Sequence, residues 1–306
     1  MFKFEKEQKI LDIGGVKIGG QPGQLPTVMM GSIFYHGDKI VEDEKEGIFD
    51  KKKAEEILRA EEEISLRTGM KRIIDVVGPF AKSFVKYIDF ICEQTKSPFL
   101  IDGTTVDVRV PAVKHVGEVG LADRAVYNSI MPGVKPEDRE KEVTAIKDAG
   151  VKAAILLTFN PKMSTIKGRL EVLKELLDIA KEAGIEKTIV DTTILDVPDP
   201  GPVSKTIYLV KENYGLPAGS GAHNAIDRWH ERHKLEPTRY LMSTAVAFAS
   251  TIMMGADFLL YGPLKRAPET YTTCALADAY VAYSMQQEYG IRPLEREHPL
   301  YKIFTV

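Results

Sequence analysis

Eight apolar runs of strand length alternate with eight longer segments of helical period along this sequence. Glycine follows most of the helical segments, at the position where a left-handed residue commonly ends a helix. Strands that are apolar nearly throughout are typical of a parallel sheet that is buried on both faces. Because eight strand–helix units close naturally into a barrel, the pattern predicts an α/β fold of the (β/α)8 or TIM barrel type.

The boundaries of these elements follow from the ends of the apolar runs and from glycine and proline. We expect strands at residues 27–35, 72–78, 98–104, 124–130, 152–160, 187–195, 217–224 and 256–263. We expect helices at residues 51–68, 80–95, 107–119, 136–149, 165–183, 203–214, 237–254 and 271–289. The alternative is a doubly wound open sheet. That fold usually has a glycine-rich turn after its first strand, and Tyr35-His36-Gly37-Asp38 offers none.

Composition and charge exclude several classes of protein. With 44% hydrophobic residues among 306, the chain is too apolar to be disordered, yet no apolar stretch is long enough to span a membrane. A net charge of −3 argues against a nucleic-acid partner. The only cysteines, Cys92 and Cys274, exclude a disulfide scaffold and a four-thiolate metal site. The N-terminus lacks the pattern of a signal peptide, so we expect a cytoplasmic protein without direct membrane insertion.

We expect one barrel domain over residues 1–306, with two additions. Residues 1–26 contain two short apolar runs around Gly14-Gly15, which indicate a β-hairpin. Because this hairpin precedes the first strand, we expect it to plug the N-terminal mouth of the barrel. Residues 36–49 form a charged insertion after the first strand, which is either a solvated loop or a lid or docking element on the active-site side.

Active sites of barrels lie at the C-terminal ends of the strands, so candidate residues follow from the predicted strand ends. Carboxylate, carboxamide and hydroxyl groups end or closely follow nearly all the runs: Ser32, Tyr35, Asp75, Asp102, Thr104, Asn128, Ser129, Asn160, Asp191, Asp196, His223, Asn224 and Tyr261. Each residue alone has a simpler interpretation as a helix cap or a turn residue. Together they predict a ring of hydrogen-bonding groups at one end of the barrel.

The residue types in this ring favour some activities over others. No lysine ends a strand, which disfavours a Schiff-base enzyme. His230 and His233 lack a third ligand, so we expect no metal site. Carboxylates and carboxamides pair well with the donor and acceptor edge of a planar heterocycle such as a pterin. Another heterocycle or a sugar would suit the same residue types.

Four strings of the sequence are long enough to be specific to one family: KIVEDEKEGIF at 39–49, IIDVVG at 73–78, DRAVYNSI at 123–130 and AAILLTFNP at 153–161. They resemble the H-subunit family of tetrahydromethanopterin S-methyltransferase, and the likeness covers essentially the whole chain. More distantly, the chain is similar to the pterin-binding barrels of corrinoid-dependent methyltransferases and dihydropteroate synthase. The resemblance implies methyl transfer between the cobalt of a protein-bound cobamide and a ring nitrogen of tetrahydrofolate or tetrahydromethanopterin. Soluble relatives of this kind use tetrahydrofolate, so the resemblance favours tetrahydrofolate as the pterin.

The resemblance also implies roles for individual residues. The residues expected to bind the pterin are Asp75, Asp102, Asn128, Ser129, Asn160, Asp191 and Asn224. Asn224 and Asp191 are the expected catalytic residues, because they would assist proton transfer at the ring nitrogen. Thr104 departs from the family pattern: pterin barrels often carry asparagine at this position, and a hydroxyl group cannot make the paired amide contact.

The implied reaction needs a second protein. A corrin is too large to enter a pocket beside a pterin, so we expect it on a separate corrinoid protein. The chain itself lacks the Asp-x-His-x-x-Gly pattern of cobalamin-binding domains. Residues 240–254 are apolar nearly all round, which indicates core burial or the face of a homodimer. Two alternatives stay open: an assembly component of a larger corrinoid methyltransferase complex, and a pterin enzyme like dihydropteroate synthase.

Overall fold

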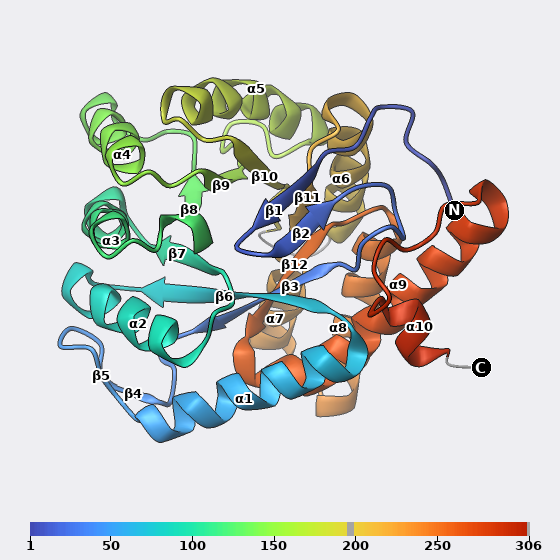
Figure 1. The fold of residues 1–306 in the computed structure, drawn as a ribbon, viewed down its shortest axis with the longest axis horizontal. Coiled ribbons are helices and arrows are strands. Elements are labelled where there is room, and N and C mark those ends of the chain that lie inside the picture. Colours follow the sequence, from blue (N-terminus) through green and yellow to red (C-terminus); the bar gives the residue numbers. More distant parts are fainter. Residues whose placement is uncertain (195–198, 305–306) are drawn as a thin grey trace.

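Eight parallel strands close into a barrel in the computed structural model, which describes residues 1–194 and 199–304 (Figure 1). The strands follow one another around the barrel in chain order. They are β3 (Val28–Ile33), β6 (Lys71–Gly78), β7 (Phe99–Gly103), β8 (Ala125–Ile130), β9 (Ala153–Leu157), β10 (Lys187–Asp191), β11 (Ala218–Ser220) and β12 (Phe258–Pro263). The predicted TIM barrel is therefore confirmed, and the doubly wound open sheet is wrong.

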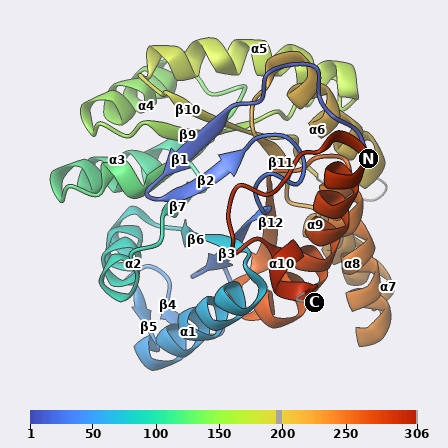
Figure 2. The same cartoon turned by 45° about the vertical axis from the view of Figure 1, so that its right-hand side comes forward.

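Helices cover the outside of the barrel (Figures 1 and 2). They are α1 (Lys51–Thr68), α2 (Ala81–Gln94), α3 (Val106–Glu118), α4 (Pro136–Asp148), α5 (Ile166–Glu182), α6 (Pro200–Tyr214), α7 (His223–His233), α8 (Pro237–Met253) and α9 (Ala267–Tyr289). The short α10 (Pro299–Ile303) packs against α1 and α9 near the C-terminus. No helix in the described part of the chain is long and apolar enough to cross a membrane.

Helix α1 illustrates why the helical segments begin and end where they do. The carboxylate of Asp50 accepts a hydrogen bond from the backbone N–H of Lys53 at 3.1 Å and so caps the first turn. Ala54, Leu58 and Ile64 recur at helical spacing and are buried against the barrel. Gly69 ends the helix at φ 78°, a left-handed conformation that glycine adopts without steric cost.

An apolar layer fills the inside of the barrel. The inward-facing residues of the strands form one buried cluster: Val28, Met30, Ile73, Leu100, Val126, Ala153, Ile155, Ile189 and Phe258. Ile13 and Ile18 join this cluster from the antiparallel hairpin of β1 (Ile10–Ile13) and β2 (Val16–Gly19). Gly14 at the turn of this hairpin lies against Pro98 and Arg124, which directly precede β7 and β8. The hairpin thus contacts the N-terminal ends of the strands, opposite the predicted site.

The expected seventh strand, at residues 217–224, is wrong in its second half. Strand β11 ends at Ser220, and α7 already begins at His223. Within α7, Ala225 and Ile226 are buried, and the backbone N–H of Asn224 donates to the carbonyl of Gly221 at 3.1 Å. The apolar run that suggested a long strand contains two glycines. The buried residues that follow have helical spacing, so the chain is helical from His223 onward. Asn224 therefore lies in the first turn of a helix.

The insertion at residues 36–49 forms a small hairpin of β4 (Val41–Asp43) and β5 (Ile48–Phe49). Its base packs on aromatic rings, since Phe34 stacks on Tyr87 of α2 at 4.3 Å and Phe49 contacts both rings edge-on. The ammonium group of Lys82 also pairs with the carboxylate of Glu46. The insertion is thus a hairpin anchored on α2, and its role as a lid or docking element stays a prediction.

Candidate active site

The alternation of side chains along each strand brings five polar residues into one layer. In each of five strands, the residue two positions after an inward-facing apolar residue is polar, and it faces inward as well because the side-chain period of a strand is two. The apolar residues are Met30, Ile73, Leu100, Val126 and Ile189. The polar residues are Ser32, Asp75, Asp102, Asn128 and Asp191, which we call the polar layer. It lies toward the C-terminal ends of the strands, where barrel enzymes bind their substrates.

Asp75 is at the centre of the polar layer. Its side chain is buried, and its Oδ2 accepts a hydrogen bond from the hydroxyl of Ser32 at 2.6 Å. The side chains of Asp102 and Asn128 lie next to it. Its Oδ1 has no hydrogen-bond partner among the described residues. A buried carboxylate oxygen without a partner is costly, so it indicates a place where a ligand supplies the missing donor.

Burial and mutual repulsion change the acidity of these carboxyl groups. Burial raises the pKa of Asp75 to about 6 and that of Asp191 to about 6. The pKa of Asp102 lies well above its ordinary value, because its carboxyl group is desolvated and faces the charge of Asp75. These raised pKa values favour a proton on the Asp75–Asp102 pair over two separate negative charges. One carboxyl group can then donate a hydrogen bond while the other accepts one.

Asp191 lies at the C-terminal end of β10, and a neighbouring turn fixes its carboxyl group. Its Oδ1 accepts a hydrogen bond from the backbone N–H of Thr193 at 2.8 Å. Asp191 and Asp102 are close enough for the charge of Asp191 to raise the pKa of Asp102. The polar layer thus has carboxylates on opposite sides, from β6 and β7 on one and from β10 on the other.

Three other predicted site residues, Asn224, Ser129 and Asn160, lie outside the polar layer. Asn224 is exposed on α7, and its amide Nδ2 donates to the carbonyl of Ile194 at 3.2 Å, so it links α7 to the loop that follows Asp191. Ser129 is buried directly after Asn128. Asn160 uses its side chain within its own loop, where Oδ1 accepts from the backbone N–H groups of Lys162 and Met163 at 3.0 and 3.1 Å.

Tyr261 and Asp196 are two further residues that the sequence predicted at the strand ends. Tyr261 of β12 is wholly buried, and its hydroxyl group donates to Glu61 of α1 at 2.9 Å, so the expectation that it lines the barrel end is wrong. Phe258 and Leu260 of β12 pack in the interior of the barrel, so the two-residue period of the strand turns Tyr261 outward. Asp196 lies outside the described residues.

Sequence reasoning missed two arginines that lie behind the site. Arg109 of α3 and Arg169 of α5 are buried, and each lowers the pKa of a carboxyl group in the polar layer. A signal was available: both occupy positions on the apolar face of an amphipathic helix, Arg109 between Val106 and Val113 and Arg169 before Val172. A charge on such a face is rarely buried without a partner.

No group of three or more histidine, cysteine or acidic side chains that could hold a metal ion occurs in residues 1–194 and 199–304. His230 packs edge-on against Tyr240 at 5.2 Å between ring centres. The two histidines that the sequence brings into consideration therefore do not form a metal centre with other described residues.

Comparison with known proteins gives the family. Residues 6–294 match the family model described as the tetrahydromethanopterin S-methyltransferase MtrH subunit. The H subunit of this enzyme from Methanothermobacter thermautotrophicus is 38% identical over 315 residues, covering 99% of this chain and 100% of that protein. This chain belongs to the H-subunit family of tetrahydromethanopterin S-methyltransferase. The H subunit of the putative methyltransferase mtx from Methanosarcina mazei is also 38% identical, covering 98% of this chain and 99% of that protein.

Solved structures agree on the fold of this H-subunit family member. The dihydropteroate synthase of Yersinia pestis has a TM-score of 0.60 and 12% identity, covering 89% of this chain and 98% of that chain. That of Xanthomonas albilineans in complex with 7,8-dihydropteroate has a TM-score of 0.57 and 16% identity, covering 91% of this chain and 98% of that chain. The H-subunit family is a methyltransferase family, and at this identity the synthases show a common barrel alone.

The raised pKa of Asp75 predicts a cost to stability. Because its pKa in the folded protein, about 6, exceeds the ordinary 3.8, folding takes up a proton between these values, and the free energy of unfolding falls as the pH rises through that window. Asp75→Asn removes this titration. We expect the variant to gain stability relative to the wild type between pH 4 and pH 8, by about 3 kcal/mol at most.

Urea unfolding followed by circular dichroism at several pH values measures this difference. Asp123→Asn changes an exposed aspartate and is the matched control, which should follow the wild-type pH dependence. A difference between Asp75→Asn and wild type that does not vary with pH would contradict the assignment of a raised pKa to Asp75.

Proposed function

We propose that this protein transfers a methyl group between a ring nitrogen of tetrahydromethanopterin and the cobalt of a cobamide carried by a separate corrinoid protein. The observation that supports this most is the polar layer, in which an oxygen of Asp75 has no hydrogen-bond partner in the part of the chain that the structure describes and lies beside Asp102 and Asn128. The layer lies at the catalytic end of a barrel whose family is a methyltransferase family.

The polar layer suits the amino-pyrimidinone edge of a pterin. That edge presents adjacent N–H donors and a carbonyl acceptor in one plane. An ionised carboxyl group of the Asp75–Asp102 pair accepts from the N–H donors, and the amide of Asn128 pairs with a donor and with the carbonyl acceptor together. The residues present therefore fit a pterin as substrate. Ser129 and Asn160 would act nearer the edge of the site.

Asp191 and Asn224 are the residues that we assign to the chemistry. A methyl group on a tertiary ring nitrogen leaves poorly, because the bond that breaks would leave a negative charge on that nitrogen. A proton delivered to the nitrogen makes the leaving group a neutral amine, and general acid assistance of this kind contributes about 10²–10⁴-fold in rate. A pKa of about 6 suits Asp191 to this task near neutral pH. Asn224 can donate a hydrogen bond to the same atom.

The names of the relatives favour tetrahydromethanopterin over tetrahydrofolate, which the resemblance to soluble relatives had favoured. The related H subunits from Methanothermobacter thermautotrophicus and Methanocaldococcus jannaschii both carry tetrahydromethanopterin in their names. The sequence itself does not distinguish the two, because both have the same pyrimidinone edge. Calorimetry with each methylated pterin distinguishes them.

The partner that we propose is a corrinoid protein that docks over the C-terminal ends of the barrel strands. The polar layer is at this end, and a corrin must come within bonding distance of the methyl group there. Because relatives of this chain are named as H subunits, we infer that this chain works with other subunits in an assembly. The alternative, a protein that serves only in assembly, predicts no methyl transfer by the isolated chain even with its cognate corrinoid protein.

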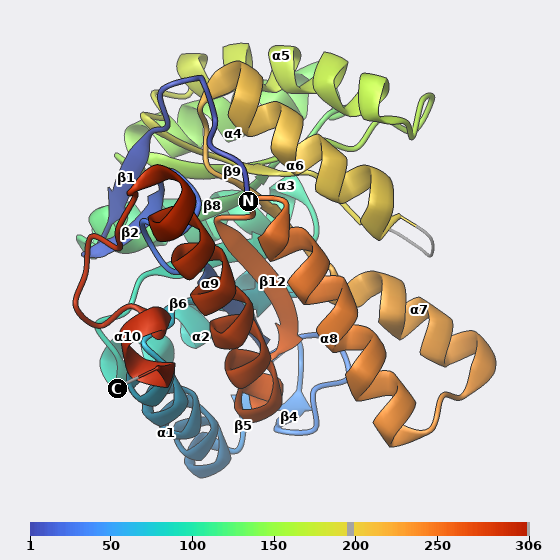
Figure 3. The same ribbon diagram turned by 90° about the vertical axis from the view of Figure 1, so that its right-hand side faces the viewer.

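We further propose a homodimer through α8 and α9, which lie side by side on one face of the molecule (Figure 3). Leu241, Met242 and Val246 of α8 are exposed, and α8 carries no charged residue after Arg239. A groove of about 310 Å³ runs between the two helices. An exposed apolar surface of this kind is typical of a protein interface, and a symmetric dimer is the commonest occupant.

Paired variants test the proposed function by separating binding from chemistry. Asp75→Ala should weaken the binding of methyl-tetrahydromethanopterin by about 2 kcal/mol, since it removes charged hydrogen bonds. Asn224→Ala should lower the rate of methyl transfer by roughly one to three orders of magnitude, because its hydrogen bond strengthens as charge develops. Calorimetry gives the first value. Stopped-flow single turnover at saturating pterin, which follows the cobalt(I) absorbance, gives the second.

Three outcomes would contradict these assignments. Wild-type affinity in Asp75→Ala would remove Asp75 from the pterin site. An unchanged saturating rate in folded Asn224→Ala would mean that Asn224 only links α7 to the neighbouring loop. No transfer by the wild type with its corrinoid protein would favour a role in assembly alone.

The dimer proposal has its own test. Val246→Arg places a charge on a side chain of α8 that is 69% exposed, and it should convert the dimer to a monomer of 34.1 kDa. Val119→Arg, on a side chain that is 49% exposed at the end of α3, is the matched control and should leave the dimer intact. Size-exclusion chromatography with light scattering gives both masses. A wild-type monomer, or a Val246→Arg dimer, would contradict the proposal.

A further inference from the structure

Two buried arginines hold the backbone directly behind the polar layer. Arg109 of α3 is 1% exposed and Arg169 of α5 is 2% exposed. Neither side chain belongs to the polar layer, and both come from the helices that cover the barrel. Their guanidinium groups nevertheless reach the backbone that follows Asp102 and Asp191.

Arg109 holds the residue after Asp102. Its Nη1 donates to the carbonyl of Gly103 at 2.7 Å, while Nε donates to the hydroxyl of Tyr127 at 2.9 Å and Nη2 to the carboxylate of Glu142 at 2.9 Å. The hydroxyl of Tyr127 donates to the same carboxylate at 2.6 Å. A Cβ atom at position 103 would lie 2.5 Å from Cγ of Arg109, so the arginine can approach this closely only because the residue is glycine.

Arg169 holds the turn after Asp191 in the same way. Its Nε donates to the carbonyl of Thr192 at 2.9 Å, its Nη2 to that of Thr193 at 3.2 Å and its Nη1 to that of Ser164 at 2.7 Å. Thr193 has φ 53°, a left-handed conformation that is strained for a β-branched residue. Such a conformation persists only where the surroundings hold it. The N–H of this same residue donates to Asp191.

We propose that Arg109 and Arg169 are positioning residues of the candidate active site: each holds, from the helix layer, the backbone that follows a carboxylate of the polar layer, and thereby fixes where Asp102 and Asp191 point. The hold of the two arginines on the backbone is a property of the ligand-free protein. The effect of this hold on pterin binding rests on the proposed function.

The charges that face Asp102 and Asp191 predict how the loss of an arginine changes the pKa of each carboxyl group. Asp102 faces Asp75 and Asp191, which raise its pKa, and Arg109, which lowers it. Burial raises the pKa of Asp191, and the turn of Thr193 and Arg169 lower it. Arg169 also lies 3.9 Å from Asp199. Removing the charge of Arg169 should therefore raise the pKa of Asp191, whereas a lysine keeps the charge but cannot reach three carbonyl groups at once.

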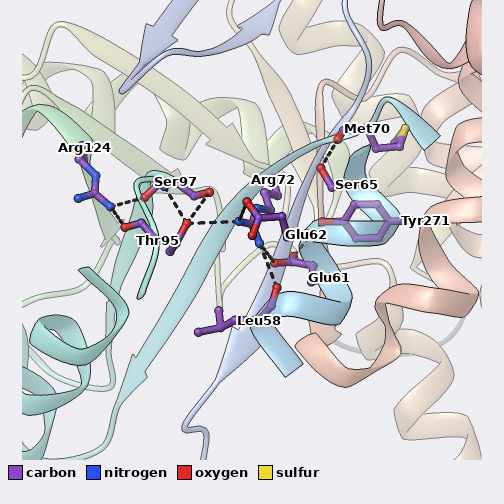
Figure 4. Close-up of polar contacts among 10 residues, drawn as sticks. All are labelled: Leu58, Glu61, Glu62, Ser65, Met70, Arg72, Thr95, Ser97, Arg124 and Tyr271. Carbon is purple, nitrogen blue, oxygen red and sulfur yellow. Dashed lines mark hydrogen bonds and ion pairs between the residues drawn. The ribbon is translucent and has the colours of Figure 1, made fainter. Parts of the chain in front are cut away.

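The control is a third buried arginine that serves no site carboxylate. Arg72 of β6 donates to the carbonyl of Leu58 and the carboxylate of Glu61, both at distances near those of the other two arginines (Figure 4). Its Nη2 donates to the hydroxyl of Thr95. Arg72 lies near the start of β6, so its variants should lower stability without any effect on the polar layer.

The experiment compares wild type with Arg169→Lys, Arg169→Met, Arg72→Lys and Arg72→Met. Carbon-13 NMR of aspartate carboxyl groups in the ligand-free protein gives the titration midpoint of Asp191, which Asp191→Asn identifies. Calorimetry with methyl-tetrahydromethanopterin gives the affinity. Thermal unfolding confirms that each variant is folded, and Arg109→Lys is a second positioning variant should Arg169→Met fail to fold.

Arg169→Met should raise the Asp191 midpoint by about half a pH unit or more, and both Arg169 variants and Arg109→Lys should weaken pterin binding by about tenfold or more. Arg169→Lys keeps the charge but loosens the turn of Thr193, so it should also raise the midpoint, by less than Arg169→Met. The Arg72 variants should change neither quantity. A wild-type midpoint in folded Arg169→Lys would overturn the positioning role, because it would leave the charge of Arg169 as its only effect on Asp191. A wild type that binds no methyl-pterin would instead refute the proposed function, because the midpoint still decides the role of Arg169.

Discussion

The two-residue period of a β-strand decides what this barrel places inside. Side chains at alternate positions of eight strands must share one interior, so a residue two positions after a buried apolar side chain faces the same space. In five strands that residue is polar. An apolar layer therefore stabilises the barrel below, and the polar layer lies directly above it. The hairpin of β1 and β2 adds to the apolar layer from the opposite end.

Burying three aspartates within reach of one another is unfavourable, and the structure compensates in several ways. Burial and mutual repulsion raise the pKa of Asp75 and of Asp102, which favours a proton on the pair over two charges. Ser32 and the turn of Thr193 supply hydrogen bonds to Asp75 and Asp191. The guanidinium groups of Arg109 and Arg169 come from the helices outside the barrel wall, so the interior stays free for a ligand. Such an arrangement costs stability and leaves donors and acceptors unsatisfied until a substrate with complementary groups binds.

The sequence predicted most of the fold and the centre of the site, because both depend on local periodicity. Strand ends that carry Asp75, Asp102, Asn128 and Asp191 could be identified from the apolar runs alone. Tyr261 was misplaced because its hydroxyl group stands near a strand end, although the two-residue period that starts from Phe258 turns it outward. The early end of β11 was missed because a short run with two glycines resembles a longer strand. Arg109 and Arg169 act across the barrel wall, and helix periodicity shows their burial but not the backbone that they contact.

The central claim is that the polar layer is the pterin site of this methyltransferase. A crystal structure of the protein with methyl-tetrahydromethanopterin tests it most directly. We expect the pyrimidinone edge within hydrogen-bond distance of Asp102 and Asn128, with Oδ1 of Asp75 now partnered. A pterin bound elsewhere, for instance in the groove between α8 and α9, with Oδ1 of Asp75 still unpartnered, would contradict it.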